Sequence, residues 1–267
     1  MSARLLRPTS FLRPLFRSAG AFALLAAILA ACGGGSGSNG PLVLFDGPAA
    51  ALRPHERGRS SLFDVRISQG DRDITDLRTS HILEDGPDGR FVFETRSEAG
   101  TSHRIRGLDR GDRIEIEAIQ EGDTWRALDP PPVIVQSPLI AGETRETRFL
   151  LTLQASVESG GAVASRALTF EGRSARTPRA WETIVVDGHE IPALAIDVRA
   201  TAEATAPHRA ETPSLRLTMN GSEHLAPGLG LLREVLSLQI DAAGKSVALQ
   251  RETERRFGPS GPSGSLP

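Results

Sequence analysis

The chain has 267 residues, with 31 lysines and arginines against 33 aspartates and glutamates, and a net charge of −2. This acidic balance argues against nucleic acid as a partner, because phosphate recognition needs a basic face. A single cysteine excludes an intrachain disulfide and a multi-cysteine metal site, whereas 39% apolar residues are enough to build a hydrophobic core.

The first 31 residues have the pattern of a secretory signal. A stretch with four arginines and no acidic residue precedes an apolar run from Ala21 to Ala31. The run is about half as long as the roughly 20 apolar residues that a transmembrane helix needs. We therefore expect residues 1–31 to be a cleaved signal peptide.

The end of this segment, Leu29-Ala30-Ala31-Cys32, resembles the lipobox of bacterial lipoproteins, and Cys32 is the one cysteine of the chain. The resemblance implies cleavage between Ala31 and Cys32, diacylglycerol on the Cys32 sulfur, and an acyl chain such as palmitate on the new amine. The lipid bilayer is then a partner through Cys32, because each buried methylene adds about 0.8 kcal/mol to membrane binding. The alternative is an ordinary secretory signal followed by a chance cysteine.

Gly33 follows Cys32 at the place of the aspartate that retains lipoproteins in the inner membrane. The resemblance therefore favours the outer membrane of a bacterial cell envelope, on its periplasmic side or beyond. Residues 32–40 are expected to be a lipidated cysteine with a flexible Gly/Ser tether, residues 41–257 a single all-β domain, and residues 258–267 a disordered tail. Without residues 1–31, which hold four arginines and no acid, 27 basic residues face 33 acidic ones, a net charge of −6.

The body is predicted to consist of β-strands. From Leu194 to Ala204, apolar and polar side chains alternate over eleven residues, which is typical of a strand with one wet face. Shorter alternating runs occur at 114–118, 149–157, 215–219 and 236–240. Because short turns without helical crossovers join antiparallel strands, we expect an all-β fold of about ten to fourteen strands, with a curved antiparallel sheet or a partly open β-barrel.

Two dipeptides, Asp187-Gly188 and Asn220-Gly221, tolerate the positive φ angles of type I′ hairpin turns, and both are predicted to be turns. Longer hairpin loops are predicted at 85–89, 121–123, 159–161 and 241–244. The prolines at 130–132 either separate two lobes or form an extended crossover within one sheet. We favour one domain, because all-β bodies of this length are often single domains.

Three segments resemble a group of uncharacterised bacterial envelope proteins. Residues 181–196 are similar to their strand–PAGxF–strand hairpin, with Asp187-Gly188-His189 at the place of the PAG tripeptide. Residues 223–233 are similar to their W-x-APGxGLV segment, with His224 where an aromatic residue is usual, and residues 132–143 to their PLPLxxG segment. The resemblance implies a partly open antiparallel β-barrel related in shape to the LolA/LolB lipoprotein carriers, and it implies no catalytic residue.

Histidines give no sign of a metal or catalytic site. They form no HxH or HExxH pattern, and we interpret them as surface residues. His189 beside Glu190 and His224 beside Glu223 would point to opposite faces of a strand, so neither pair is an assembled acid–base pair. The six histidines are His55, His81, His103, His189, His208 and His224.

A cluster of aspartates and two tryptophans carry side chains of the kinds that bind metal ions and ligands. Asp71, Asp73 and Asp76 form an oxygen-rich cluster, but the segment lacks the glycine and terminal glutamate of an EF-hand loop, so we interpret it as a solvated turn. Trp125 and Trp181 are interpreted as packing anchors rather than as platforms for a ligand.

We therefore predict a membrane-anchored lipoprotein that is not an enzyme, whose β-rich body serves binding or assembly without catalytic residues, metal or cofactor. The first alternative is a carrier of a hydrophobic ligand such as a lipid, in which Ala200, Ala202 and Ala204 on an inward face would leave a cavity. The second alternative is a hydrolase whose Ser, His and Asp residues come from distant parts of the chain.

Overall fold

The computed structural model describes residues 41–159, 162–205, 215–242 and 245–257, with the side chains of 153–168, 205 and 242–245 left out. The predicted signal peptide, Cys32, the tether and the tail lie outside the described residues. The described part contains fifteen strands and one four-residue helix. The elements are β1 (Val43–Phe45), α3 (Ala49–Leu52), β2 (Ser60–Gln69), β3 (Arg72–Asp85), β4 (Arg90–Ser97), β5 (Ser102–Asp109), β6 (Arg113–Glu121), β7 (Thr124–Asp129), β8 (Val133–Gln136), β9 (Leu139–Ile140), β10 (Arg145–Ser159), β11 (Ala162–Val186), β12 (His189–Thr205), β13 (Leu215–Ala226), β14 (Gly230–Ala242) and β15 (Lys245–Arg256).

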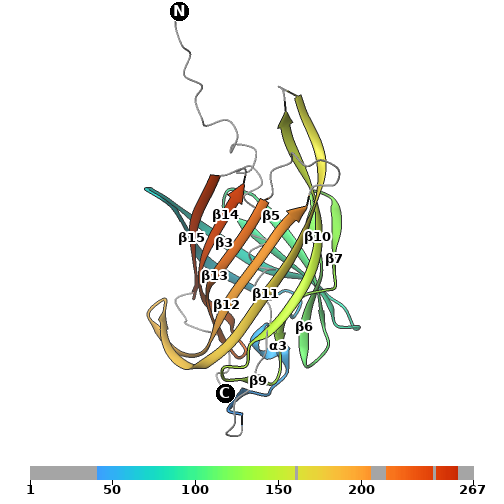
Figure 1. Ribbon diagram of the computed structural model, residues 1–267. Helices are drawn as coiled ribbons and strands as arrows, with labels where there is room; N and C mark the ends of the chain where they lie inside the picture. The colour runs from blue at the N-terminus through green and yellow to red at the C-terminus, as the bar shows by residue number, and fades with distance from the viewer. Residues whose placement is uncertain (1–40, 160–161, 206–214, 243–244, 258–267) are drawn as a thin grey trace, which may run out of the picture.

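Twelve of these strands form one closed antiparallel barrel (Figure 1). The order around the barrel is β5-β4-β3-β2-β15-β14-β13-β12-β11-β10-β7-β6, and the pairing of β6 with β5 closes the ring. Strand β8 also pairs with β6, beyond the residues that β6 uses for β7. The predicted all-β, antiparallel fold is confirmed, and the curvature of the sheet extends to full closure.

The alternation in the sequence separates the inner from the outer surface of the barrel wall. In β12, Val198, Ala200 and Ala202 are buried, whereas Arg199 and Glu203 between them are exposed. The alternating runs in β6, β13 and β14 behave in the same way, with their apolar side chains turned to the interior. The predicted strands are therefore confirmed where their side chains are described.

Two glycines on the inner surface are each covered by an aromatic ring from the neighbouring strand. Gly107 of β5 lies opposite Phe91 of β4, and Gly172 of β11 lies opposite Phe149 of β10. In both pairs a Cβ on the glycine would collide with the phenylalanine ring. A ring that covers a cross-strand glycine fills the space where the sheet bends, which accounts for these residues in a closed wall.

One of the two predicted type I′ turns is confirmed. Asp187 and Gly188 join β11 to β12 with φ angles of 48° and 79°, as such a turn requires. The prediction of a turn at Asn220-Gly221 is wrong, because both residues lie within β13 and pair with β14. A Cβ at Gly221 would collide with the carbonyl oxygen of Val235. Glycine at this position permits a close approach of two strands, which the sequence does not distinguish from a turn.

The longer connections follow the predictions where the structure describes them. Residues 86–89 join β3 to β4 and residues 122–123 join β6 to β7, while Asp85 and Glu121 are the last residues of their strands. Residues 160–161 and 243–244, within the other two predicted loops, lie outside the described residues. The proline-rich segment 130–132 connects β7 with β8, and both strands pair with β6. It is therefore a crossover within one sheet.

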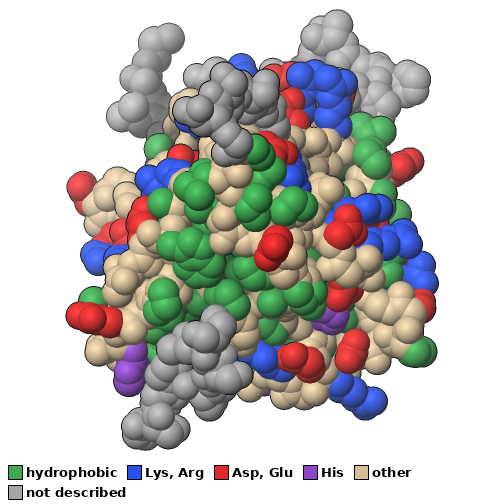
Figure 2. All heavy atoms as spheres, turned by 90° about the horizontal axis from the view of Figure 1, so that it is seen from below, with side chains coloured by type: hydrophobic (Ala, Val, Ile, Leu, Met, Phe, Trp, Pro, Cys, Tyr) green, Lys and Arg blue, Asp and Glu red, His purple; other side chains and the backbone are tan. Residues whose placement is uncertain are grey.

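Helix α3 and the two-stranded ribbon of β1 and β9 lie at one end of the barrel (Figure 1). Ala49 and Leu52 of the helix are fully buried in a cluster with Leu194 and other apolar side chains from the wall. The N–H of Gly228, in the β13–β14 turn, donates to the carbonyl of Ala51 at 2.7 Å. Figure 2 views the molecule from this end and shows hydrophobic side chains gathered near its centre, with charged side chains around them. The helix thus plugs this end.

The part of the interior next to β10–β13 is filled with packed side chains, which we call the packed core. Phe149, Phe170, Leu217 and Met219 are at most 2% exposed. Ala200, Ala202 and Ala204 belong to the same cluster, so the structure places them in the packed core and not at a cavity. Ala202 lies opposite Gly172, and the small residues make room for the Phe149 ring. Across the described parts of the chain, a helix of membrane-spanning length and hydropathy is absent.

Candidate functional site

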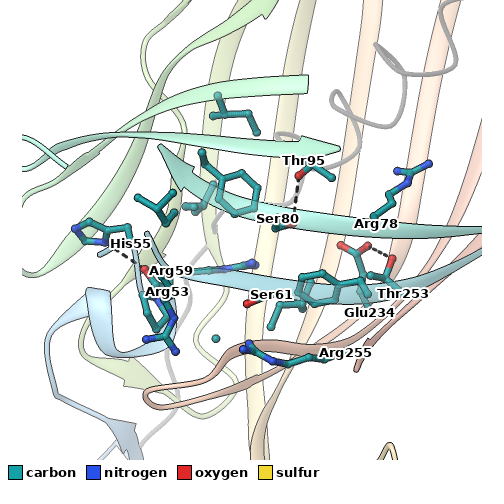
Figure 3. Close-up of a pocket in the computed structure, with 18 of the residues that line it drawn as sticks. Arg53, His55, Arg59, Ser61, Arg78, Ser80, Thr95, Glu234, Thr253 and Arg255 are labelled. Carbon is teal, nitrogen blue, oxygen red and sulfur yellow. Dashed lines mark hydrogen bonds between the residues drawn. The ribbon is translucent and has the colours of Figure 1, made fainter. Parts of the chain in front are cut away.

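A pocket of about 230 Å³ lies inside the barrel, next to the plugged end. Its lining comes mainly from β2–β5, β14 and β15, and from the segment that follows α3 (Figure 3). A barrel of about eight strands is just filled by its own side chains. A barrel of twelve strands encloses more space, and the packed core occupies only part of it. The pocket is the part of the interior that the packed core leaves open.

One side of the pocket is hydrophobic, and we call it the apolar wall. Its members project inward from adjacent strands, and cross-strand pairing aligns them. Phe93 of β4, for example, lies opposite Ile82 of β3 on one side and Ile105 of β5 on the other. The apolar wall consists of Phe63, Val65, Ile82, Phe91, Phe93, Ile105, Ile116 and Ile134.

A row of polar side chains, which we call the polar belt, crosses four strands beside the apolar wall. Ser61 lies opposite Ser80, Ser80 opposite Thr95, and Thr95 opposite His103. Directly opposed residues of antiparallel strands share a face of the sheet, so all four project into the pocket, which they line. The hydroxyl oxygens of Ser80 and Thr95 are 3.4 Å apart. The belt offers hydrogen-bonding groups along one level of the pocket.

Five arginines and two glutamates also line the pocket. The carboxylate of Glu223, a residue 1% exposed, accepts hydrogen bonds from Arg53 at 2.6 Å and from Arg176. Arg251 forms an ion pair with Glu234. Both glutamates are therefore neutralised by arginines of the barrel interior.

Two further arginines have carboxylate partners outside the lining. Arg78 pairs with Asp76 at 2.8 Å, and Arg59 pairs with Glu56 at 3.0 Å. The Glu56 side chain is 71% exposed, so water weakens this second pair. Arg59 also donates through Nη2 to the carbonyl of Gly228. It is consequently a cation that only a solvated carboxylate offsets.

Arg255 differs from the other four. It is 9% exposed, and among the described residues no carboxylate lies within ion-pair distance of it. Its Nη1 donates to the carbonyl of Leu229, and its Nε has no hydrogen-bond partner. Burial, and then the charge of Arg59, lower the pKa of Arg255 to about 10. The guanidinium lies 5.5 Å from the ring centre of Phe257 and remains charged at neutral pH, although no carboxylate among the described residues pairs with it.

The two histidines of the pocket occupy different surroundings. His103, at the end of the polar belt, has its pKa lowered by burial and then by the charge of Arg78. The imidazole of His55 stacks on Phe91 with ring centres 4.5 Å apart, and its Nε2 is 3.4 Å from a carboxylate oxygen of Asp109. The interpretation of these two histidines as surface residues is wrong, because the segment after α3 places His55 in the pocket and the inward face of β5 places His103 there.

The other histidines lie outside the pocket. His224 and Glu223 project to opposite faces of β13, as predicted, since Glu223 is buried with Arg53 whereas His224 lies 3.4 Å from Glu182. His189 contacts the ring of Phe257 edge-on, with centroids 5.8 Å apart. His208 lies outside the described residues, and His81 is half-buried in β3.

The aspartate cluster is distributed among arginines. Asp73 pairs with Arg66, which lowers the pKa of the Asp73 carboxyl, and Asp76 pairs with Arg78. Within the described residues there is no group of three or more side chains placed to hold a metal ion. Asp71 lies in the turn before β3, whereas Asp73 and Asp76 lie within β3, so the interpretation of the segment as a turn is correct for Asp71 alone.

The two tryptophans make structural contacts. The indole N–H of Trp181 donates to the carbonyl of Leu44 at 2.8 Å and so fixes the segment at β1 to the barrel wall. The guanidinium of Arg106 lies 4.5 Å from the ring centre of Trp125. Neither residue lines the pocket, which agrees with their interpretation as packing anchors.

The residues that line the pocket could not be recognised from the sequence. Ser61, Ser80 and Thr95 lie in three strands whose spacing in the chain gives no sign of contact. Arg255 belongs to a run of charged residues at the end of β15, which has the pattern of a solvated strand. Only the alternation Arg251, Thr253, Arg255, with one face of β15 in common, could have indicated a polar inner surface.

Comparisons with known proteins give distant similarities. No protein-family model matches the chain, and no curated protein is similar to it in sequence. A candidate exported protein with a YmcC-like fold from Bacteroides fragilis shares 10% identity, over 81% of this chain and 100% of that one, with a TM-score of 0.35. A candidate lipoprotein from Parabacteroides distasonis shares 12% identity, over 82% and 100%, with a TM-score of 0.35. These scores support no inference about activity or ligand.

Proposed function

We propose that this protein is a lipid-anchored, non-catalytic binding protein of the bacterial cell envelope, and that the pocket inside its barrel takes a small, partly apolar ligand. The observation that carries the proposal is the pocket itself, in which the apolar wall faces hydrogen-bonding and charged groups. Ligand sites in proteins typically combine a mostly apolar lining with a few placed polar groups. At about 230 Å³, the pocket is smaller than the 300–1,000 Å³ usual for drug-sized ligands, which favours a short molecule over a whole membrane lipid.

The proposed anchor rests on the lipobox-like segment that ends at Cys32. We expect the wild-type chain, expressed in its native host, to fractionate with membranes, and the outer membrane is the preferred location. The variant Cys32→Ala is expected to move to the soluble fraction. A matched control is Ser36→Ala in the tether, which leaves the cysteine in place and is expected to stay with the membranes. Membrane association of Cys32→Ala equal to that of the control would contradict the anchor.

The non-catalytic part of the proposal is supported by the contacts of the histidines. Among the described residues, no histidine ring is hydrogen-bonded to a serine or threonine hydroxyl. A nucleophile in a serine hydrolase needs a base within hydrogen-bond reach. The polar belt therefore fits binding better than nucleophilic attack.

Native mass spectrometry tests the binding role. The chain carrying Cys32→Ala, purified from the soluble fraction of its host without detergent, is expected to carry an additional mass that disappears on denaturation. The control is a pocket-filling variant, Ser61→Leu, which is expected to show the mass of the protein alone. A Cys32→Ala chain with no added mass, and with no affinity for any short amphiphile, would remove the proposed binding role.

A further inference from the structure

The pocket holds a positive charge that the described residues do not balance. Four of its five arginines have a carboxylate partner, whereas Arg255 has none. A buried charge is costly to a protein unless it is paired. This position therefore suggests that the missing partner is something the pocket binds.

Arg59 adds to the same positive region. Arg59 and Arg255 donate to the carbonyls of Gly228 and Leu229, which are consecutive residues of the β13–β14 turn. Two guanidiniums are thereby held close to each other, and the charge of Arg59 contributes to the lowered pKa of Arg255. Repulsion between the two cations would be relieved by an anion between or beside them.

The geometry of Arg255 leaves it able to bind such an anion. A guanidinium has five N–H donors, and the structure shows one of them in use, by the carbonyl of Leu229. Its neighbour across the pair of strands is Phe63 of the apolar wall. Figure 3 places Arg255 among the side chains that surround the pocket, with Ser61 nearby. A charged donor therefore adjoins a hydrophobic surface.

We propose that the pocket binds a short anionic amphiphile, with one carboxylate or phosphate group held by Arg255 and Arg59 and an apolar part against Phe63, Ile82 and Phe93. This inference rests on the proposed function and specifies the charge of its ligand. Arginine suits the task because its planar donors match the oxygens of carboxylates and phosphates.

The test uses four probes of equal chain length with the full chain carrying Cys32→Ala, so that no detergent is needed. Isothermal titration calorimetry compares octanoate, octyl phosphate, octanol and octyltrimethylammonium. We expect octanoate or octyl phosphate to bind at least ten-fold more tightly than octanol, and the cationic probe to bind least. Comparison of the first two probes decides between carboxylate and phosphate.

The variant Arg255→Met removes the charge and keeps most of the side-chain length. It is expected to weaken binding of the anionic probe at least ten-fold and to leave octanol binding unchanged, whereas Arg255→Lys retains part of the affinity. The matched control is Arg256→Met, since Arg256 is the next residue along β15, is 51% exposed and pairs with Asp64 on the outer surface. It is expected to bind all probes as the parent does.

The possible results separate this inference from the proposed function. Equal affinity for octanoate, octyl phosphate and octanol would overturn the anion site while the binding pocket stands. Tightest binding of the cationic probe would overturn it as well. Absence of binding by all four probes would overturn both. If Arg255→Met fails to fold, judged by circular dichroism, the comparison of probes on the parent chain still decides.

Discussion

The two parts of the barrel interior are built from the same kind of strand but are filled differently. Next to β10–β13, aromatic and aliphatic side chains interlock over alanines and glycines, and the packed core results. Next to β2–β5 and β15, serines, threonine and arginines share the inward positions with the apolar wall, and the pocket remains. Closure of a twelve-strand wall therefore does not by itself determine what fills the interior. The side chain at every second position determines it.

Charge separates the two parts as clearly as volume does. The inward side chains of β12 and β13 are apolar up to Glu223, which lies at the boundary and binds arginines from β11 and from the segment after α3. Beyond this boundary the inward face of β15 carries Arg251 and Arg255. Stability is therefore expected to reside in the packed core and binding in the pocket.

The strongest test of this division removes an aromatic ring from each side. Phe149→Ala in the packed core is expected to lower the free energy of unfolding by about 3–5 kcal/mol, because the ring is 1% exposed and no neighbour can refill the space above Gly172. Phe93→Ala in the apolar wall is expected to cost roughly 1–2 kcal/mol, because it already faces a pocket and only part of the transfer free energy is lost. Urea unfolding followed by circular dichroism measures both.

A similar loss of stability in Phe149→Ala and Phe93→Ala would contradict the division. We expect both variants to keep the barrel closed. The slope of the unfolding free energy against urea concentration should therefore match that of the wild type.

Adding a larger side chain to each part of the interior tests the same division in the opposite direction. Ala202→Leu is expected to destabilise the barrel by about 1–3 kcal/mol, because the packed core has no room for three more carbon atoms. Ser61→Leu is expected to change stability by about 0.5 kcal/mol or less, because its side chain extends into the pocket, and to abolish binding of the probes. Thermal unfolding and calorimetry report the two effects separately. Normal stability of Ala202→Leu would show that the core is not close-packed.

The smallest expected effect concerns pH. Since burial and Arg78 lower the pKa of His103 below its ordinary value of 6.5, the unfolded chain binds a proton at this site more readily than the folded one. The contribution of neutral His103 to the free energy of unfolding is therefore fully present above pH 6.5. It is lost as the pH falls through and below that value. The variant His103→Gln is expected to show a smaller decline in melting temperature between pH 7.5 and 5.5 than the wild type.

The control for this titration is His189→Gln, because His189 lies at the β11–β12 hairpin and is not among the residues that line the pocket. It is expected to follow the wild-type pH profile. A decline that is the same in His103→Gln and in the wild type would assign the pH dependence to other groups.

Some features could be predicted from particular residues and others could not. The alternation at 194–204 and the pair Asp187-Gly188 specify a long strand and a tight turn, because each depends only on neighbours in the chain. The pair Asn220-Gly221 has the same local pattern but serves a close contact with Val235, a residue fourteen or more positions away. The alanines of β12 likewise gave no indication whether a large ring or empty space lies opposite them.

The all-β class, the antiparallel order and the inward or outward direction of most strand residues could be read from the chain alone, because these follow from a period of two and from short connections. Only the tertiary structure decided that β5 meets β6 to close the ring, that Phe149 fills one part of the interior, and that Ser61, Ser80, Thr95 and His103 share a row with Arg255 nearby. The physical reason is that strand register and barrel closure bring together residues from distant parts of the chain, and neither leaves a mark on the local pattern.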